Sequence, residues 1–329
     1  MPQEYKHLDA HARCIIFTLR AEGLTLRAIA ARANVHHATI SRELKRNINP
    51  KGGYCYKHAQ KASVSRRQIA SQRQSKMNQT DMRDFVLDQL KRFQSSPRQI
   101  SGFLKRKHNL CISHETIYKY IWTDKKKSGN LFVNLRHRGK KYNKRGAKTA
   151  GRGLIPGRID ISQRPKIVES KVRIGDLEAD LIMGADHKGA ILSLVDRHSK
   201  YTKLHILNGK TKAEVTAAII KVLYRSKHYL KTITYDNGKE FAGHADIAKK
   251  LSVDCYFATP YHSWERGLNE HTNGLVRQYF PKGMPFDSLT QRDVKNVENI
   301  LNHRPREILN FHTPHEVFTA ATKSGALHH

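Results

Sequence analysis

The sequence predicts a multi-domain protein in which an all-α helix-turn-helix region precedes an α/β domain. Three observations support this prediction. Capped, amphipathic segments with a helical period dominate residues 8–122. From residue 166 the pattern changes to short apolar runs that are typical of strands. The length of 329 residues exceeds that of one typical domain, and a composition of 38% hydrophobic and 27% charged residues is that of a globular protein.

Positive charge is concentrated in the first half of the chain. Residues 1–165 contain 36 Lys/Arg and 10 Asp/Glu, a net charge of +26, whereas residues 166–329 contain 24 and 18, a net charge of +6. A region this basic predicts a polyanionic partner, and double-stranded DNA or RNA is expected. An anionic membrane is the alternative, and the lack of an apolar run of about 18 residues argues against it.

The sequence gives no indication of export. Its first residues, MPQEYKHLDAHARC, contain no apolar segment of the kind found in signal peptides. The four cysteines are scattered and form no pair with metal-binding spacing: Cys14, Cys55, Cys111 and Cys255. We therefore expect reduced thiols in a cytoplasmic, nucleoid-associated protein with no membrane segment.

Residues 8–46 predict three short helices. Asp9 and Thr25 are placed to cap the first two helices. Gly23 is placed to end the first helix, and Asn34 tolerates the left-handed conformation that a tight turn after the second requires. The spacing is that of a helix-turn-helix, with an ordinary helical hairpin as the alternative.

The third helix, at about His37–Arg46, is the expected DNA-reading helix. Ile40 and Leu44 are spaced for burial on one face, and the small Ala30 allows the preceding helix to cross closely. The second helix of such a motif enters the major groove of DNA. The polar residues left to contact DNA are His37, Thr39, Ser41, Arg42 and Lys45.

A second helix-turn-helix is expected at residues 96–122. Ser96-Pro97 resembles an N-cap followed by a first-turn proline, and Ser113 is placed to cap the second helix. A pair of helices used for packing or dimerisation is the alternative. The residues expected to face inward are Ile100, Phe103, Leu104, Ile117, Tyr120 and Ile121.

Polar segments separate these regions. Residues 55–80 indicate a polar helix or linker, and residues 124–165, which include RHRGKKYNKRG, indicate an extended, solvated basic linker that follows DNA phosphates. The predicted domains are a helix-turn-helix domain at 1–54, a linker at 55–80, a second helix-turn-helix domain at 81–123, a basic linker at 124–165 and an α/β domain at 166–329.

The α/β domain is expected to contain a mixed five-stranded sheet covered by helices, in the order βββαβαβα. The predicted strands are Val172–Gly184, Ala190–Asp196, Tyr201–Leu207, Leu230–Tyr235 and Val253–Ala258. The predicted helices are Thr211–Arg225, His244–Leu251, Arg266–Tyr279 and Asp293–Leu301.

Three carboxylates are candidates for a catalytic, metal-binding site. Asp180 lies on the first predicted strand, Asp236 ends the fourth, and Glu270 lies on the helix after the fifth. Each alone is ordinarily a solvated surface charge, but in this topology the first and fourth strands can lie side by side with the helix beside them. Glu178, on the same strand face as Asp180, and Asn273, one turn after Glu270, are expected to support the three carboxylates.

Convergent carboxylates repel one another, and a divalent cation removes this cost. Ligands that are all oxygen favour Mg²⁺ or Mn²⁺, and the sequence contains no Cys/His set for zinc. Two ions, held at about 3.5–4 Å from each other, activate a water or a 3′-hydroxyl and stabilise the leaving oxygen in phosphodiester chemistry.

Long motifs around these residues resemble the IS-thirty family of bacterial insertion-sequence transposases. They are TYDNGKEFAGH (Thr234–His244), YHSWERGLNEHTNGLVRQYFPKG (Tyr261–Gly283), LNHRPREILNFHTPHEVF (Leu301–Phe318), HATISRELKRN (His37–Asn47) and SHETIYKYIW (Ser113–Trp122). The resemblance implies a ribonuclease-H-like, integrase-type catalytic domain of the DDE class, whose triad falls on Asp180, Asp236 and Glu270. It also implies binding of terminal inverted repeats and target DNA, Mg²⁺-dependent strand cleavage and strand transfer.

The chain departs from the family pattern at three places. It has Leu177-Glu178-Ala179-Asp180 where the family usually has Trp-Glu-Gly-Asp, and His262-Ser263 where the family usually has Ser-Pro. Tyr235 stands before the second aspartate in place of a small residue. No departure removes a carboxylate.

A DNA transposase that acts as a homo-oligomer, a dimer or higher, on DNA is therefore expected. A non-catalytic, sequence-specific DNA-binding regulator is the first alternative, and it would not need three convergent carboxylates. An RNA-directed nuclease is the second, and it would not need helices that enter the major groove, because A-form duplexes hide theirs.

Overall fold

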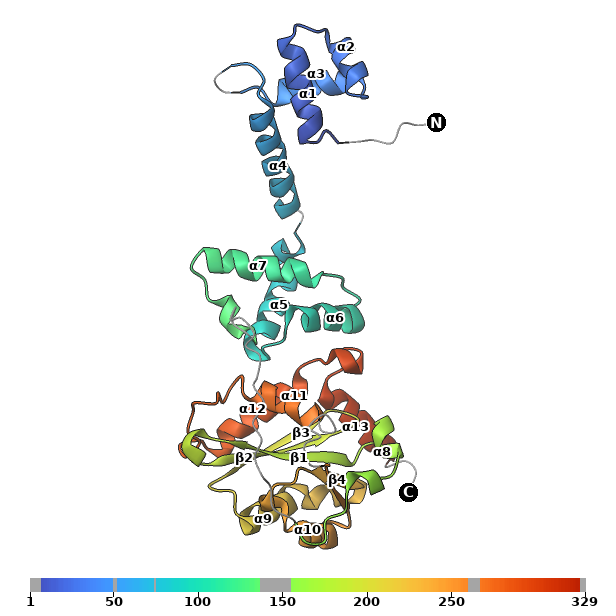
Figure 1. Ribbon diagram of the computed structural model, residues 1–329, viewed down its shortest axis with the longest axis vertical. Helices are drawn as coiled ribbons and strands as arrows, with labels where there is room; N and C mark the ends of the chain where they lie inside the picture. Colours follow the sequence, from blue (N-terminus) through green and yellow to red (C-terminus); the bar gives the residue numbers. More distant parts are fainter. Residues whose placement is uncertain (1–6, 50–51, 74, 137–154, 260–266, 326–329) are drawn as a thin grey trace. The chain divides into compact units, whose positions relative to one another are not determined.

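The computed structural model describes residues 7–49, 52–73, 75–136, 155–259 and 267–325. The chain forms two compact units, Met1–Gln79 and Thr80–His329, which are considered separately (Figure 1). Among the described residues, no helix has the length and apolar character needed to cross a membrane.

The first unit contains the predicted helix-turn-helix. The Asp9 and Thr25 side chains accept hydrogen bonds from backbone N–H groups of the helices that they cap, and Asn34 has the expected positive φ of 51°. A small core of buried side chains holds the helices together: Ile16, Leu19, Ile29, Ala30 and Ile40. The helices are α1 (Ala10–Ala21), α2 (Leu26–Arg32), α3 (His37–Arg46) and α4 (Tyr56–Arg73).

The predicted polar linker at 55–80 is largely the helix α4, and α4 belongs to the first unit. A polar network joins α4 to the helix-turn-helix through Arg13. The Arg13 guanidinium is paired with Glu43 of α3 at 2.7 Å and donates to Gln60 Oε1 at 2.7 Å and to Ser63 Oγ at 3.2 Å on α4. Arg13 and Glu43 are 6% and 8% exposed. An apolar period gave little sign of this helix, because much of its attachment is polar.

The second unit begins with three helices, α5 (Thr80–Arg92), α6 (Pro97–His108) and α7 (His114–Lys126). Ser96 and Ser113 cap α6 and α7 as predicted, and Ile100, Phe103, Leu104, Ile117 and Ile121 are buried, whereas Tyr120 is half-buried. The capping box between Ser96 and Gln99 satisfies two backbone groups at once.

The interpretation of 124–165 as an extended, solvated linker is wrong at both described ends. Its first residues continue α7 and then form the 3₁₀ helix η2 (Leu131–Asn134). At the other end, Ile159 O accepts a hydrogen bond from Phe257 N of the sheet, and Arg164 is 7% exposed. The basic composition of this segment gave no sign of its backbone and side-chain contacts with the α/β domain. The most basic stretch, at 137–154, lies outside the described residues.

A five-stranded mixed sheet with the order β3-β2-β1-β4-β5 forms the centre of the α/β domain. The first three strands form an antiparallel meander, and β4 and β5 are parallel to β1. This agrees with the predicted order and with the expected neighbourhood of the first and fourth strands. The strands are β1 (Asp176–Met183), β2 (Ala190–Asp196), β3 (Thr202–Leu207), β4 (Thr232–Tyr235) and β5 (Asp254–Phe257).

Helices cover both faces of the sheet (Figure 1). On one face lie α9 (Lys212–Leu223) and α10 (His244–Leu251), and on the other lie α11 (Gly267–Val276), α12 (Gln291–His303) and α13 (Pro314–Gly325). Separate apolar clusters fill the two interfaces, one around Ile219 and Ile247 and the other around Leu275 and Val294. The helix α11 thus lies over the sheet face that carries the candidate carboxylates.

Our first prediction concerns the Arg13 network. Replacing Arg13 by Ala leaves Glu43 buried without its cation, a change that typically costs about 3–5 kcal/mol. Hydrogen exchange of α1 and α4 amides in the full-length protein should show a corresponding loss of protection. The exposed Arg20 of α1 is the matched control, and Arg20→Ala should change protection little. Equal protection in the two variants would contradict the role of Arg13.

Candidate active site

Asp180 lies on β1, and Asp236 directly follows the end of the adjacent strand β4. In the parallel pair β1–β4, Asp176, Leu177 and Glu178 stand opposite Thr232, Ile233 and Thr234. The pairing ends at Glu178 and Thr234, and the same offset continued by two residues would bring Asp180 opposite Asp236, which directly follows the end of β4. Neighbouring strands lie about 4.8 Å apart. Continuation of this register would therefore bring two of the three predicted carboxylates to neighbouring positions.

Close backbone approach fixes this register where β1 begins. Gly175 has a φ of +94°, and a Cβ built there would lie 1.9 Å from Tyr229 O, so a side chain has no room. Gly175 O accepts hydrogen bonds from Lys231 N and Thr232 N, just before and at the start of β4. These bonds align β1 and β4 at their N-terminal ends, ahead of Asp180 and Asp236 in the chain.

The alternation of β1 separates its polar from its apolar residues. Glu178 and Asp180 share the face toward α11, whereas Leu177 and Ala179 belong to the core on the other face. Tyr235 is fully buried in that same core, where its ring lies 4.9 Å from Phe241. The departures at Leu177 and Ala179 and at Tyr235, two of the three places, thus lie in the core and leave the carboxylate face intact. His262-Ser263 lies outside the described residues.

The helix α11 reaches Asp180 through Asn273. Asn273 Nδ2 donates to Asp180 Oδ2 at 2.6 Å, and Ser193 Oγ of β2 donates to Asn273 Oδ1 at 3.2 Å. The second bond sets the orientation of the amide, so that its N–H₂ group faces the carboxylate. Ser193 was missed from sequence, although a serine inside the buried run AILSLVD was a usable signal.

Glu270 lies one turn before Asn273, in the first turn of α11, and its side chain is exposed. Among the residues that the structure describes, no three His, Cys, Asp or Glu side chains are grouped tightly enough to hold a metal ion. The residues directly before α11, 260–266, lie outside the described part of the chain.

Glu178 has a structural partner of its own. It is 1% exposed and pairs at 2.7 Å with Arg197, which is 2% exposed and also binds the exposed Glu169 at 3.1 Å. Glu178 Oε2 also accepts a hydrogen bond from Asn269 N at the start of α11, at 3.2 Å. Glu178 therefore joins β1 to α11. Glu270 directly follows Asn269 on this helix, so the same bond holds the backbone of Glu270 near the sheet.

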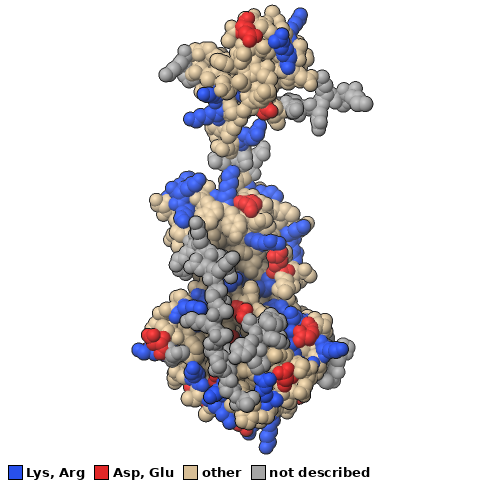
Figure 2. Space-filling model, viewed as in Figure 1, with Lys and Arg blue, Asp and Glu red and all other residues tan. Residues whose placement is uncertain are grey.

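In the first unit, α3 presents the predicted DNA-reading side chains. His37, Arg42 and Lys45 are exposed, and Thr39 and Ser41 are half-buried. Figure 2 shows that Lys and Arg outnumber Asp and Glu on the visible face of this unit. Glu43, an acidic residue that would repel DNA, is instead buried against Arg13. The outer face of α3 is therefore basic.

A helix-turn-helix unit joined to an α/β domain with a mixed five-stranded sheet is an architecture expected of a DNA-processing protein. A family model described as "Helix-turn-helix domain" matches residues 4–47. The chain is 44% identical over 314 residues to the Transposase for insertion sequence element IS4351 of Bacteroides fragilis, covering 95% of each chain.

Two further relatives extend this similarity. The Transposase for insertion sequence element IS1086 of Cupriavidus metallidurans is 35% identical, with 95% of this chain and 94% of the relative covered. The Transposase InsI for insertion sequence element IS30A of Escherichia coli is 34% identical, with 89% and 78% covered. The chain therefore belongs to the IS30 family of insertion-sequence transposases, as its motifs predicted.

Our second prediction concerns the buried pair of Glu178 and Arg197. Glu178→Ala leaves the buried Arg197 with one exposed partner and should destabilise the protein by roughly 3 kcal/mol or more. Asp254→Ala, which removes an exposed carboxylate of β5, is the control and should cost about 1 kcal/mol or less. Urea unfolding of both full-length variants provides the comparison, and an equal loss of stability in the two would contradict this assignment.

Proposed function

We propose that the protein is a DDE-type transposase in which Asp180, Asp236 and Glu270 hold two divalent ions, Mg²⁺ or Mn²⁺. In this proposal it binds the terminal inverted repeats of an insertion sequence, cleaves DNA strands at its ends and transfers them to target DNA. The observation that carries the proposal is the β1–β4 register, whose offset, continued two residues past the pair Glu178–Thr234, would bring the two aspartates opposite each other. The hydrogen bond from Asn273 to Asp180 on the helix that carries Glu270 supports it.

The donor set fits such ions, because all six carboxylate oxygens are hard ligands and no thiol or imidazole competes with them in the triad. When bound, the two ions supply activation of the attacking oxygen and stabilisation of the leaving one. The protein residues fix the geometry. The β1–β4 register, continued past its last pair, would set the spacing of Asp180 and Asp236. Asn273 orients the Asp180 carboxylate, and Glu178 attaches the start of α11 to the sheet.

Glu270 completes the site from the helix side. Its exposed side chain extends from the first turn of α11, one turn from Asn273. Rotation about its side-chain bonds, without movement of the backbone, is the expected response to a cation held by the two aspartates. The proposal therefore predicts that the site closes when metal and DNA bind.

DNA recognition is assigned to α3, whose exposed His37, Arg42 and Lys45 face solvent together. An insertion sequence has two ends, and one catalytic domain acts on one strand at a time. We therefore expect a homo-oligomer, a dimer or higher, to hold both ends together.

Our third prediction tests the triad. Asp180→Asn, Asp236→Asn and Glu270→Gln should each abolish Mg²⁺-dependent cleavage of labelled terminal DNA, because each removes a charged metal ligand. Binding of the same DNA in EDTA should be nearly unchanged. Asp254→Asn, at an exposed carboxylate of β5, is the control and should retain cleavage.

Cleavage that persists in all three triad variants would overturn the catalytic assignment. No cleavage by the unmodified protein on any terminal DNA, with sequence-specific binding retained, would instead favour a non-catalytic regulator.

Our fourth prediction concerns base recognition. A good base-edge contact contributes about 1–3 kcal/mol, so Arg42→Ala should weaken specific binding about tenfold or more if Arg42 contacts a base. If it contacts only phosphate, affinity should fall equally on specific and random DNA. Binding assays on both DNAs, with Arg20→Ala as the control, distinguish the two contacts. Unchanged affinity on both DNAs would count against α3 as the reading helix.

A further inference from the structure

A pocket of about 1150 Å³ lies in the second unit, on a different face of α11 from Glu270 and Asn273. Residues of α11 that line it include Leu268, His271 and Leu275, which share one side of the helix. The volume exceeds that of most pockets for single small molecules. The carboxylate triad does not use this pocket, although Glu178 is on its wall.

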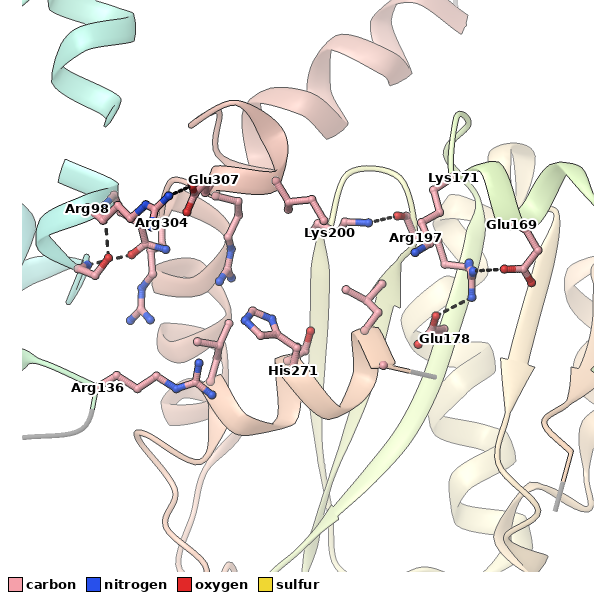
Figure 3. Close-up of a pocket in the computed structure, with 18 of the residues that line it drawn as sticks. Arg98, Arg136, Glu169, Lys171, Glu178, Arg197, Lys200, His271, Arg304 and Glu307 are labelled. Carbon is pink, nitrogen blue, oxygen red and sulfur yellow. Dashed lines mark hydrogen bonds and ion pairs between the residues drawn. The ribbon is translucent and has the colours of Figure 1, made fainter. Parts of the chain in front are cut away.

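Positive charge dominates the described wall of the pocket. Seven Lys or Arg side chains line it, against three glutamates. All three glutamates are already paired, Glu307 with Arg98 and both Glu169 and Glu178 with Arg197. Figure 3 shows the Glu178–Arg197–Glu169 group at one end, and Arg136 and Arg304 with the His271 ring toward the other.

Two arginines of the Leu301–Phe318 motif are buried at that second end. Arg304 is 2% exposed and donates only to neutral acceptors in the described chain, namely Phe93 O, Gln278 Oε1 and the Tyr279 hydroxyl. Burying a cation without a counter-charge is costly. Arg304 therefore has its hydrogen bonds satisfied but its charge uncompensated.

Arg306 is less well satisfied. It is 7% exposed, its Nη2 donates to Leu301 O at 3.1 Å, and its Nε has no hydrogen-bond partner. Burial, with the nearby positive charges of Arg304 and Arg136, lowers the pKa of Arg306 to about 9. An unpaired N–H on a nearly buried guanidinium that lines a pocket indicates a missing acceptor.

Arg136 adds a third guanidinium from the segment after η2. It is exposed and lines the same pocket. A Cβ built on Gly274 of α11 would lie 2.7 Å from Arg136 Nη2, so this guanidinium lies against the helix backbone, next to the residue that holds Asp180. His271 of α11 lines the same pocket, with Arg136 and Arg304 toward the same end (Figure 3).

We propose that Arg136, Arg304 and Arg306 form a phosphate-binding site on the opposite flank of α11 from the triad, and that its occupant is a phosphodiester of DNA. Guanidinium groups bind phosphate oxygens with paired, charge-assisted hydrogen bonds. A bound phosphate would supply both the missing hydrogen-bond acceptor and the missing negative charge. The size of the pocket and the length of its basic wall fit a nucleotide chain better than a single free anion. The identity of the occupant as DNA rests on the proposed function, but the anion site does not.

The first arm of the test uses inorganic phosphate with the full-length protein. Sodium phosphate, compared with sodium chloride at equal ionic strength, should raise the thermal unfolding midpoint, because a ligand that binds the folded state stabilises it. Arg136→Gln should remove much of this rise, and so should Arg306→Gln if it folds. The control Arg225→Gln changes an exposed arginine of η5 (Tyr224–Tyr229) outside the pocket, and should retain the full rise.

The second arm measures DNA affinity in EDTA as a function of salt. Loss of one phosphate contact should reduce the slope of log affinity against log salt by about 0.9. Arg136→Gln should show this reduction and weaken binding roughly tenfold at low salt, whereas Arg225→Gln should not. Because no cleavage is measured, failure of the catalytic assignment leaves this readout unaffected.

The two measurements together distinguish three outcomes. Both effects in Arg136→Gln, and neither in Arg225→Gln, would support a DNA phosphate site. Loss of the phosphate effect with an unchanged DNA slope would overturn DNA as the occupant and identify a site for free phosphate. If phosphate raised the thermal unfolding midpoint equally in the unmodified protein and in every variant, or in none of them, the proposed anion site would be wrong.

Discussion

Parallel pairing of β1 with β4 is the constraint on which the catalytic half depends. Hydrogen bonds between Gly175 and the start of β4 align the strands, and the resulting register, continued two residues past Glu178 and Thr234, would bring Asp180 opposite Asp236. Adjacent carboxylates repel, so the sheet must hold them against a cost that a bound cation would remove. The large apolar clusters on both sheet faces stabilise the domain and offset the cost of holding these carboxylates close together.

The buried ion pair of Glu178 and Arg197 helps to fix the position of α11 on the sheet. Glu178 pairs with Arg197 and accepts a bond from the first turn of α11, so β1, the loop after β2 and the helix are joined at one point. Asn273 repeats the connection one turn further along, at Asp180 itself. Glu270 lies between these two attachments, which fixes its backbone while its side chain stays exposed.

Much of this could be predicted from the sequence because the signals are local. Caps at Asp9, Thr25, Ser96 and Ser113 and the period of the strands located most elements within a few residues. The polar residues Arg13, Ser193 and Arg197 were missed, because their roles depend on partners 30, 80 and 19 residues away. The same holds for Arg304 and Arg306, which composition alone assigns to a solvated basic surface although both are buried.

The central claim is that Asp180, Asp236 and Glu270 surround one metal site, and Fe²⁺ in place of Mg²⁺ tests it most directly. With ascorbate and peroxide, protein-bound Fe²⁺ generates radicals that cut the polypeptide near its ligands. In the full-length protein bound to terminal DNA, the account predicts cuts within β1 near Asp180, just after β4 near Asp236 and in the first turn of α11, all suppressed by excess Mg²⁺. Cuts confined to other segments, or the absence of Mg²⁺-sensitive cuts in any one of these three, would contradict it.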